Sequence, residues 1–167
     1  SGGLALTLGS AILDELVDEC LSLTHALAVS RAISIALPVA SGCTLLTDRV
    51  RMKQAIVNLL TNSVKYSRQG GQVRLEYEFT DEQCIRIHVH DTGGGIAPER
   101  LPELFQPFHR LGQELGEVEG TGIGLAITKQ LIEAMGGVVG ASSTLGEGSD
   151  FWLELPVPAE NKRGVTA

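Results

Sequence analysis

Three glycines at alternate positions, Gly120, Gly122 and Gly124, precede a run of helical periodicity that extends to Met135. Glycine lacks a Cβ atom, so a ligand can approach the backbone closely there. The first N–H groups of a helix have no partner within it, and the helix macrodipole adds partial positive charge at that end. The pattern predicts a phosphate site around residues 122 to 126. Taken alone, it is equally consistent with a tight turn packed against a sheet.

Two asparagines and a lysine lie on one side of a second predicted helix. Asn58, Asn62 and Lys65 are spaced at i, i+4 and i+7, which aligns them along the helix axis. Amide oxygens are suitable Mg²⁺ ligands beside triphosphate oxygens and water, and a lysine can neutralise a phosphate. We therefore expect a metal and phosphate site on this face, the alternative being an ordinary solvated face.

An acidic residue ends one of the predicted strands. Asp91 has the same parity as the apolar residues Ile85, Ile87 and Val89, so its carboxylate should face the interior, and three glycines follow at 93–95. An ionised aspartate only accepts hydrogen bonds. It would accept one from the exocyclic amine of adenine and repel the carbonyl of guanine. The alternative is an Asx turn at a strand terminus.

The segment between these motifs has little periodicity. Residues 109–119 combine glycines and charges, which is typical of a lid over a ligand. Arg110, at the base of this segment, can bring a guanidinium to a terminal phosphate. An ordinary polar loop is the alternative.

Periodicity predicts the elements that position these groups. Ser10 is expected to cap a helix that reaches about Val29, Asp48 to cap one that reaches about Tyr66, and Pro98 to start a short helix, with a further helix over residues 125–135. Alternating apolar residues predict these strands: Leu4–Leu8, 32–37, Val73–Phe79, Cys84–Val89 and Ser149–Leu155.

The strands have one polar face, which decides between fold classes. Arg74, Glu76 and Glu78 alternate with apolar residues, so one side of the sheet should be solvated. A doubly wound Rossmann sheet is buried on both faces and would have continuous apolar strands. We predict an α/β (α+β) two-layer sandwich, with a mixed, largely antiparallel sheet and three main helices on one face.

Composition narrows the function classes. The chain has 167 residues, 43% of them hydrophobic, and a net charge of −7. A single domain without basic blocks is a poor candidate for binding nucleic acid or a membrane surface. Three cysteines with no Cys-x-x-Cys pair indicate reduced thiols and a cytoplasmic location. The P-loop pattern is absent, and no Gly-x-Gly-x-x-Gly directly follows a strand, which counts against P-loop enzymes and dinucleotide oxidoreductases.

Five motifs in order resemble those of the catalytic ATP-binding domain of two-component sensor histidine kinases, in the superfamily that includes gyrase and the mismatch-repair ATPase. Residues 51–67 resemble its asparagine box, 90–99 its first glycine box and 104–110 its phenylalanine box. Residues 120–127 and 146–156 resemble its later glycine boxes. The resemblance implies the Bergerat ATP-binding fold over residues 4–158, with 1–3 as a linker or expression remnant and 159–167 as a C-terminal tail.

The resemblance also implies residue roles. Asp91 would hold adenine, Asn62 would ligate Mg²⁺, Asn58 and Lys65 would lie along the phosphates, and Arg110 would approach the γ-phosphate. The other residues expected to contact ATP are Tyr66, Gly93, Gly95, Ile96, Gly120, Thr121, Gly122, Gly124, Leu125 and Ser149.

The implied reaction is transfer of the γ-phosphoryl group to a histidine. Superfamily members that hydrolyse ATP place a glutamate base where this chain has Asn58, so water is not the expected acceptor. None of His25, His88, His90 or His109 lies in a His-Glu/Asp-x-x-x-Pro pattern. The acceptor histidine is therefore expected on a separate dimerisation hairpin of a longer protein, whether or not that protein is membrane-anchored, with a response regulator as the downstream partner.

Two alternatives remain on the same fold. One is a serine kinase of the anti-sigma-factor type, and the other is a pseudokinase that binds nucleotide without turnover. Acid stability of the phosphorylated residue separates the first, since phosphohistidine is lost in acid. Nucleotide binding without transfer, even with the hairpin present, would identify the second.

Overall fold

The computed structural model describes residues 5–80, 83–106 and 124–158. It contains the helices α1 (Leu13–Ser30), α2 (Arg49–Tyr66) and α3 (Gly124–Ala134), and the 3-10 helix η1 (Pro98–Glu103). The strands are β1 (Gly9–Ile12), β2 (Ser34–Ala36), β3 (Thr44–Thr47), β4 (Gln72–Phe79), β5 (Cys84–Asp91), β6 (Val138–Thr144) and β7 (Gly148–Pro156). No α-helix within the described ranges is long and apolar enough to cross a membrane.

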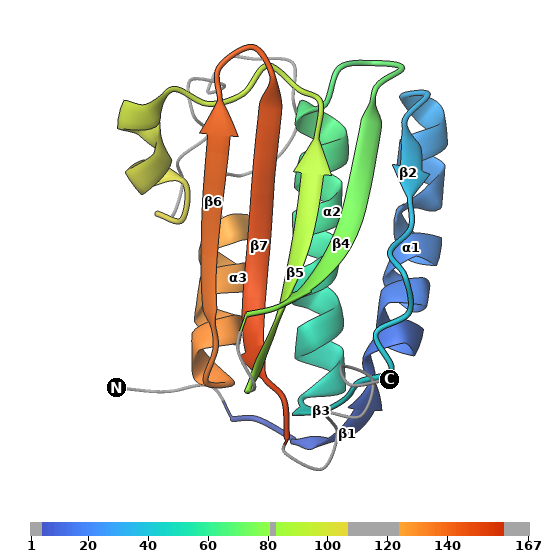
Figure 1. Cartoon of the computed structure of the whole chain (residues 1–167), viewed down its shortest axis with the longest axis vertical. Helices are drawn as coiled ribbons and strands as arrows, with labels where there is room; N and C mark the ends of the chain where they lie inside the picture. Colours follow the sequence, from blue (N-terminus) through green and yellow to red (C-terminus); the bar gives the residue numbers. More distant parts are fainter. Residues whose placement is uncertain (1–4, 81–82, 107–123, 159–167) are drawn as a thin grey trace.

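The main sheet has five strands in the order β2-β4-β5-β7-β6. Strand β2 runs parallel to β4, and the other neighbours are antiparallel. Helices α1, α2 and α3 cover one face of this sheet, and β1 pairs with β3 in a small separate sheet (Figure 1). The predicted two-layer sandwich, largely antiparallel and with three main helices on one face, is therefore confirmed.

The core lies between the sheet and the helices. Strands β5 and β7 alternate strictly between buried and partly exposed residues, as a sheet with one covered face requires. The sheet contributes these buried side chains: Val73, Leu75, Ile85, Ile87, Val89, Phe151, Leu153 and Leu155. Helix α2 packs Met52, Ile56, Leu59, Leu60 and Val64 against them. Because α2 lies at the centre of this layer, its position relative to β5 is fixed by the core.

The predicted positions of the first strand and of the start of the first helix are wrong. The described part of Leu4–Leu8 forms no strand, and β1 lies at Gly9–Ile12, where it pairs with β3. Ser10 is therefore in a strand, and α1 begins at Leu13 after Ile12, which makes no side-chain capping bond. The predicted cap of α2 is confirmed, since the Asp48 carboxylate accepts a hydrogen bond from the backbone N–H of Arg51.

Candidate functional site

Asp91 is the last residue of β5 and its side chain is buried, with a relative exposure of 6%. Its Oδ1 accepts a hydrogen bond from the backbone N–H of Gly93 at 2.8 Å. Its Oδ2 is also buried, and no described residue offers it a hydrogen bond. Burial raises the pKa of this carboxyl, and the backbone N–H groups of Gly93 and Ser149 oppose the rise. The Gly93 contact is the Asx turn that the sequence left as the alternative. Asp91 also has a buried Oδ2 with no hydrogen-bond partner among the described residues, and its inward orientation is the one that strand parity predicts.

The backbone after Asp91 packs too closely for side chains. A Cβ atom added to Gly93 would lie 2.2 Å from the backbone oxygen of Tyr66, at the end of α2. One added to Gly95 would lie 2.3 Å from the backbone oxygen of Thr144, and Gly95 also has a φ of 76°. These two glycines let the loop pass between α2 and β6 beside the aspartate.

Gly93→Ala is expected to lower the free energy of unfolding by about 3 kcal/mol, because the new methyl group meets backbone atoms that cannot rotate away. Gly94→Ala is the matched control, since no described atom lies within 4 Å of its added Cβ. Urea unfolding measures both effects. Equal stability of the two variants would show that the loop is not as closely packed as described.

A second group of predicted residues gathers where α2 meets α3. The side-chain amide of Asn58 donates to the backbone oxygen of Gly124 at 3.2 Å. A Cβ added to Gly124 would lie 3.9 Å from both the Asn58 Cγ and the Asn62 Nδ2. Leu125, the next residue of α3, is buried in the core, and Lys65 is half-buried one turn beyond Asn62. The amide face of α2 and the first residues of α3 therefore adjoin. The spacing predicts that Asn58 and Asn62 share a face of α2, and the fold brings that face to α3.

Hydrogen bonds around Ser143 connect two further predicted residues, Ile96 and Ser149. The backbone N–H of Ile96 donates to the Ser143 Oγ at 2.7 Å, and this hydroxyl lies 2.9 Å from the Ser149 Oγ. Ser149 is also the partner of Asp91 in the register of β5 with β7. These contacts hold the loop after β5 against the β6–β7 hairpin.

Two residues that position this site have no role assigned to them from the sequence. Ser143 was not identified because β6 has no clear apolar alternation. Gly148 begins β7 with a φ of 130°, and a Cβ added there would lie 2.0 Å from the backbone oxygen of Asp91. The sequence places Gly148 in the glycine box at 146–156 but gives it no role of its own.

The predicted site residues that the structure describes form two groups, one around Asp91 and one beside α3. Tyr66, at the end of α2, lies with Gly93 beside Asp91, whereas Asn58 and Asn62 lie beside α3. The predicted lid at 109–119 lies outside the described residues. So do four predicted site residues: Arg110, Gly120, Thr121 and Gly122.

The chain is similar to known proteins in both sequence and structure. Residues 47–159 match the family described as histidine kinase-, DNA gyrase B-, and HSP90-like ATPase. The sensor histidine kinase GacS of Pseudomonas protegens is 42% identical over 118 residues, which cover 68% of this chain and 13% of that protein. The sensor protein TorS of Escherichia coli is 38% identical over 144 residues, which cover 85% of this chain and 15% of that protein.

Solved structures agree with these matches. Full-length ShkA in complex with AMPPNP has a TM-score of 0.81 at 32% identity, over 94% of this chain and 32% of that one. The catalytic domain of the histidine kinase ThkA has a TM-score of 0.79 at 24% identity, over 93% of this chain and 99% of that one, and supports the fold. The chain thus spans a minor part of the length of GacS, TorS and ShkA. It belongs to the histidine kinase-, DNA gyrase B- and HSP90-like ATPase family and is homologous to the catalytic ATP-binding domains of sensor histidine kinases.

Proposed function

We propose that residues 4–158 form the catalytic domain of a sensor histidine kinase. In this proposal the domain binds ATP with Mg²⁺ and transfers the γ-phosphoryl group to a histidine on a separate hairpin of a longer protein, for relay to a response regulator. The observation that carries it is the buried Asp91 Oδ2, which has no partner among the described residues. The ShkA complex with AMPPNP supports it by similarity of sequence and fold, and the complex of ThkA with the response regulator TrrA supports it by similarity of fold alone.

Adenine recognition is assigned to Asp91 and its neighbours. An acceptor that is buried and unsatisfied costs free energy, and the exocyclic amine of adenine supplies the donor that would offset this cost. Gly93 and Gly95 let the loop pack closely against α2 and β6, which would hold its backbone beside the base at Asp91. Tyr66, Ile96 and Ser149 would border it from α2, the loop and β7, a set expected from the resemblance and consistent with their positions around Asp91.

Metal and phosphate binding is assigned to the face of α2 that adjoins α3. The Asn62 side chain supplies an amide oxygen, a ligand type that suits Mg²⁺. Asn58 and Lys65 would contact the phosphates from the same helix. Gly124 and Leu125 are the first residues of α3, where backbone N–H groups would contact phosphate oxygens at the positive end of the helix. The remaining contacts would come from Arg110, Gly120, Thr121 and Gly122.

The chemistry assigned to these residues is positioning and charge neutralisation. Mg²⁺ would supply charge compensation for the phosphates when bound. Lys65 and Arg110 would add fixed positive charge. Asn58 would help to position the phosphates through its amide, which does not accept a proton. Phosphoryl transfer needs little more than this from the protein, since most catalysis comes from alignment and electrostatics.

The test of this function uses the longer parent protein. Incubation with radiolabelled ATP and Mg²⁺ is expected to produce a phosphorylated residue that is lost in acid and stable in base. An acid-stable phosphoserine would instead identify the serine kinase alternative. Nucleotide binding without any transfer would identify the pseudokinase.

A further inference from the structure

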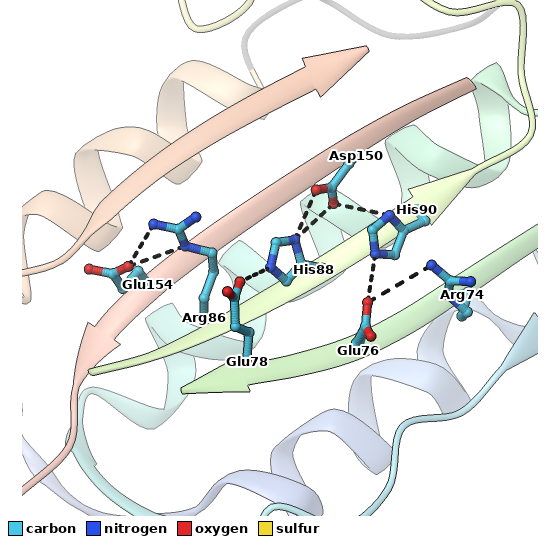
Figure 2. Close-up of polar contacts among 8 residues, drawn as sticks. All are labelled: Arg74, Glu76, Glu78, Arg86, His88, His90, Asp150 and Glu154. Atoms are coloured by element: carbon cyan, nitrogen blue, oxygen red, sulfur yellow. Dashed lines mark hydrogen bonds and ion pairs between the residues drawn. The ribbon is translucent and has the colours of Figure 1, made fainter. Parts of the chain in front are cut away.

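Two histidines and an aspartate gather on the sheet face that the helices leave uncovered. His88 and His90 are alternate residues of β5, and Asp150 lies on the neighbouring strand β7, opposite His90 in the register. The Nδ1 atom of His88 lies 2.9 Å from Asp150 Oδ2, and that of His90 lies 3.5 Å from Asp150 Oδ1 (Figure 2). The two rings are stacked with an interplanar angle of 5°. Each residue offers one ligand atom, and these atoms all lie within 4.8 Å of one another.

The opposite nitrogen of each ring contacts a glutamate of β4. His88 Nε2 lies 2.7 Å from Glu78 Oε1, and His90 Nε2 lies 3.0 Å from Glu76 Oε1 (Figure 2). A neutral imidazole has one N–H, so it can donate to only one of its two carboxylate neighbours. If both rings donate from Nε2 to the glutamates, each Nδ1 atom is an unprotonated acceptor beside the Asp150 carboxylate and has no hydrogen to donate to it. This arrangement is satisfied by a cation between the two Nδ1 atoms and Asp150. Because the two rings are parallel, a shared ion would require them to tilt towards it.

We propose that His88 Nδ1, His90 Nδ1 and the Asp150 carboxylate bind one divalent transition-metal ion of the Zn²⁺ type. Zinc bonds to histidine nitrogen and carboxylate oxygen are about 2.0 Å long, which places tetrahedral ligand atoms about 3.3 Å apart. The two distances from Asp150 to the ring nitrogens, 2.9 and 3.5 Å, bracket this spacing. Two imidazoles with one carboxylate favour zinc, copper or nickel over Mg²⁺ or Ca²⁺, which prefer oxygen ligands.

The glutamates fit the outer shell of such a site. Histidines that ligate metals usually donate their other ring N–H to a carboxylate, which fixes the tautomer and orients the ring. Glu78 and Glu76 hold these positions for His88 and His90, respectively. The carboxylates of Glu76, Glu78 and Asp150 also make the surroundings attractive to a cation. The bound ion would join β5 to β7 and leave a fourth position for water.

This site is separate from the proposed nucleotide site. His90 is the neighbour of Asp91 in β5, and Asp150 is the neighbour of Ser149 in β7. Adjacent residues of a strand point to opposite faces of the sheet, so the side chains of His90 and Asp150 lie on the face opposite the nucleotide site. The two proposals can therefore fail independently, because zinc binding is measured here without any nucleotide.

The test is titration of the full 167-residue chain with ZnCl₂ against a chromophoric chelator, with thermal unfolding measured in parallel. We expect one equivalent of zinc to bind and to raise the unfolding temperature. Separate substitutions His88→Gln, His90→Gln and Asp150→Asn should each weaken binding at least ~10-fold, and Glu78→Gln should also weaken it by roughly tenfold through the outer shell. Metal-free unfolding of each variant verifies that it is folded.

The matched controls are His25→Gln and Cys84→Ser. His25 is an exposed histidine on α1, and Cys84 is a partly buried thiol at the start of β5. Both control variants should bind zinc as the unchanged chain does. Zinc binding that survives the loss of both His88 and His90, or no binding at all at high micromolar zinc, would overturn the proposal and leave the cluster as an ion-pair network.

Discussion

Asp91→Asn is expected to weaken ATP binding by roughly 100-fold. The substitution removes a negative charge and places an amide donor in the region of the Oδ2 acceptor, where it would face the donor amine of adenine. A hydrogen bond to a charged group contributes about 1.5–3 kcal/mol, and each 1.4 kcal/mol is about tenfold in affinity. Isothermal titration with ATP measures the change. Wild-type affinity in this variant would contradict the assignment of adenine to Asp91.

The stability of the same variant separates a binding defect from a folding defect. Burial raises the pKa of Asp91, so the folded state bears an unfavourable charge above that pKa. The cost is present at neutral pH and is relieved as the pH falls through the raised pKa. Asp91→Asn should therefore unfold at the same or a higher temperature at neutral pH, and the wild type should gain stability relative to it on acidification. A variant that is unfolded at neutral pH would contradict this account of the buried charge.

Asn62→Ala is expected to reduce the contribution of Mg²⁺ to ATP binding by at least ~10-fold, while metal-free binding changes little. The reason is that an alanine offers no oxygen to the ion, whereas the adenine contacts are on a different part of the site. Titrations with excess Mg²⁺ and with EDTA measure the two affinities separately.

Gln54→Ala is the matched control for this substitution. Gln54 is an exposed amide on the same helix, eight residues and about 12 Å along the axis from Asn62. It should bind ATP with an unchanged dependence on Mg²⁺. Equal losses for Asn62→Ala with and without the metal would argue against a metal role.

The parts of the site that lie on long periodic elements could be predicted from the sequence. The parity of Asp91 followed from its strand, because every second residue of β5 is buried. The alignment of Asn58 with Asn62 followed from helical geometry, which is independent of what surrounds the helix. Strong alternation and a capping aspartate at Asp48 were sufficient to define these elements.

Other features depend on contacts between distant segments. Residues 4–8 and 9–12 both permit a strand, and pairing with β3 selects the second, which displaces the start of α1. Strand β6 was not predicted because it is an edge strand with small and polar residues, and Gly140 is needed there since an added Cβ would lie 2.1 Å from the Trp152 ring. The contact of Asn58 with Gly124 joins residues 66 apart in sequence, which no local pattern specifies.

Competition between nucleotides tests most directly whether an ionised aspartate selects adenine. A fluorescent ATP analogue is bound to the chain and displaced with ATP or GTP, each with and without Mg²⁺. ATP is expected to displace it at concentrations at least ~10-fold lower than GTP, because guanine presents a carbonyl to the Asp91 carboxylate, and Mg²⁺ should strengthen ATP binding. Equal displacement by GTP and ATP would contradict recognition of adenine by Asp91.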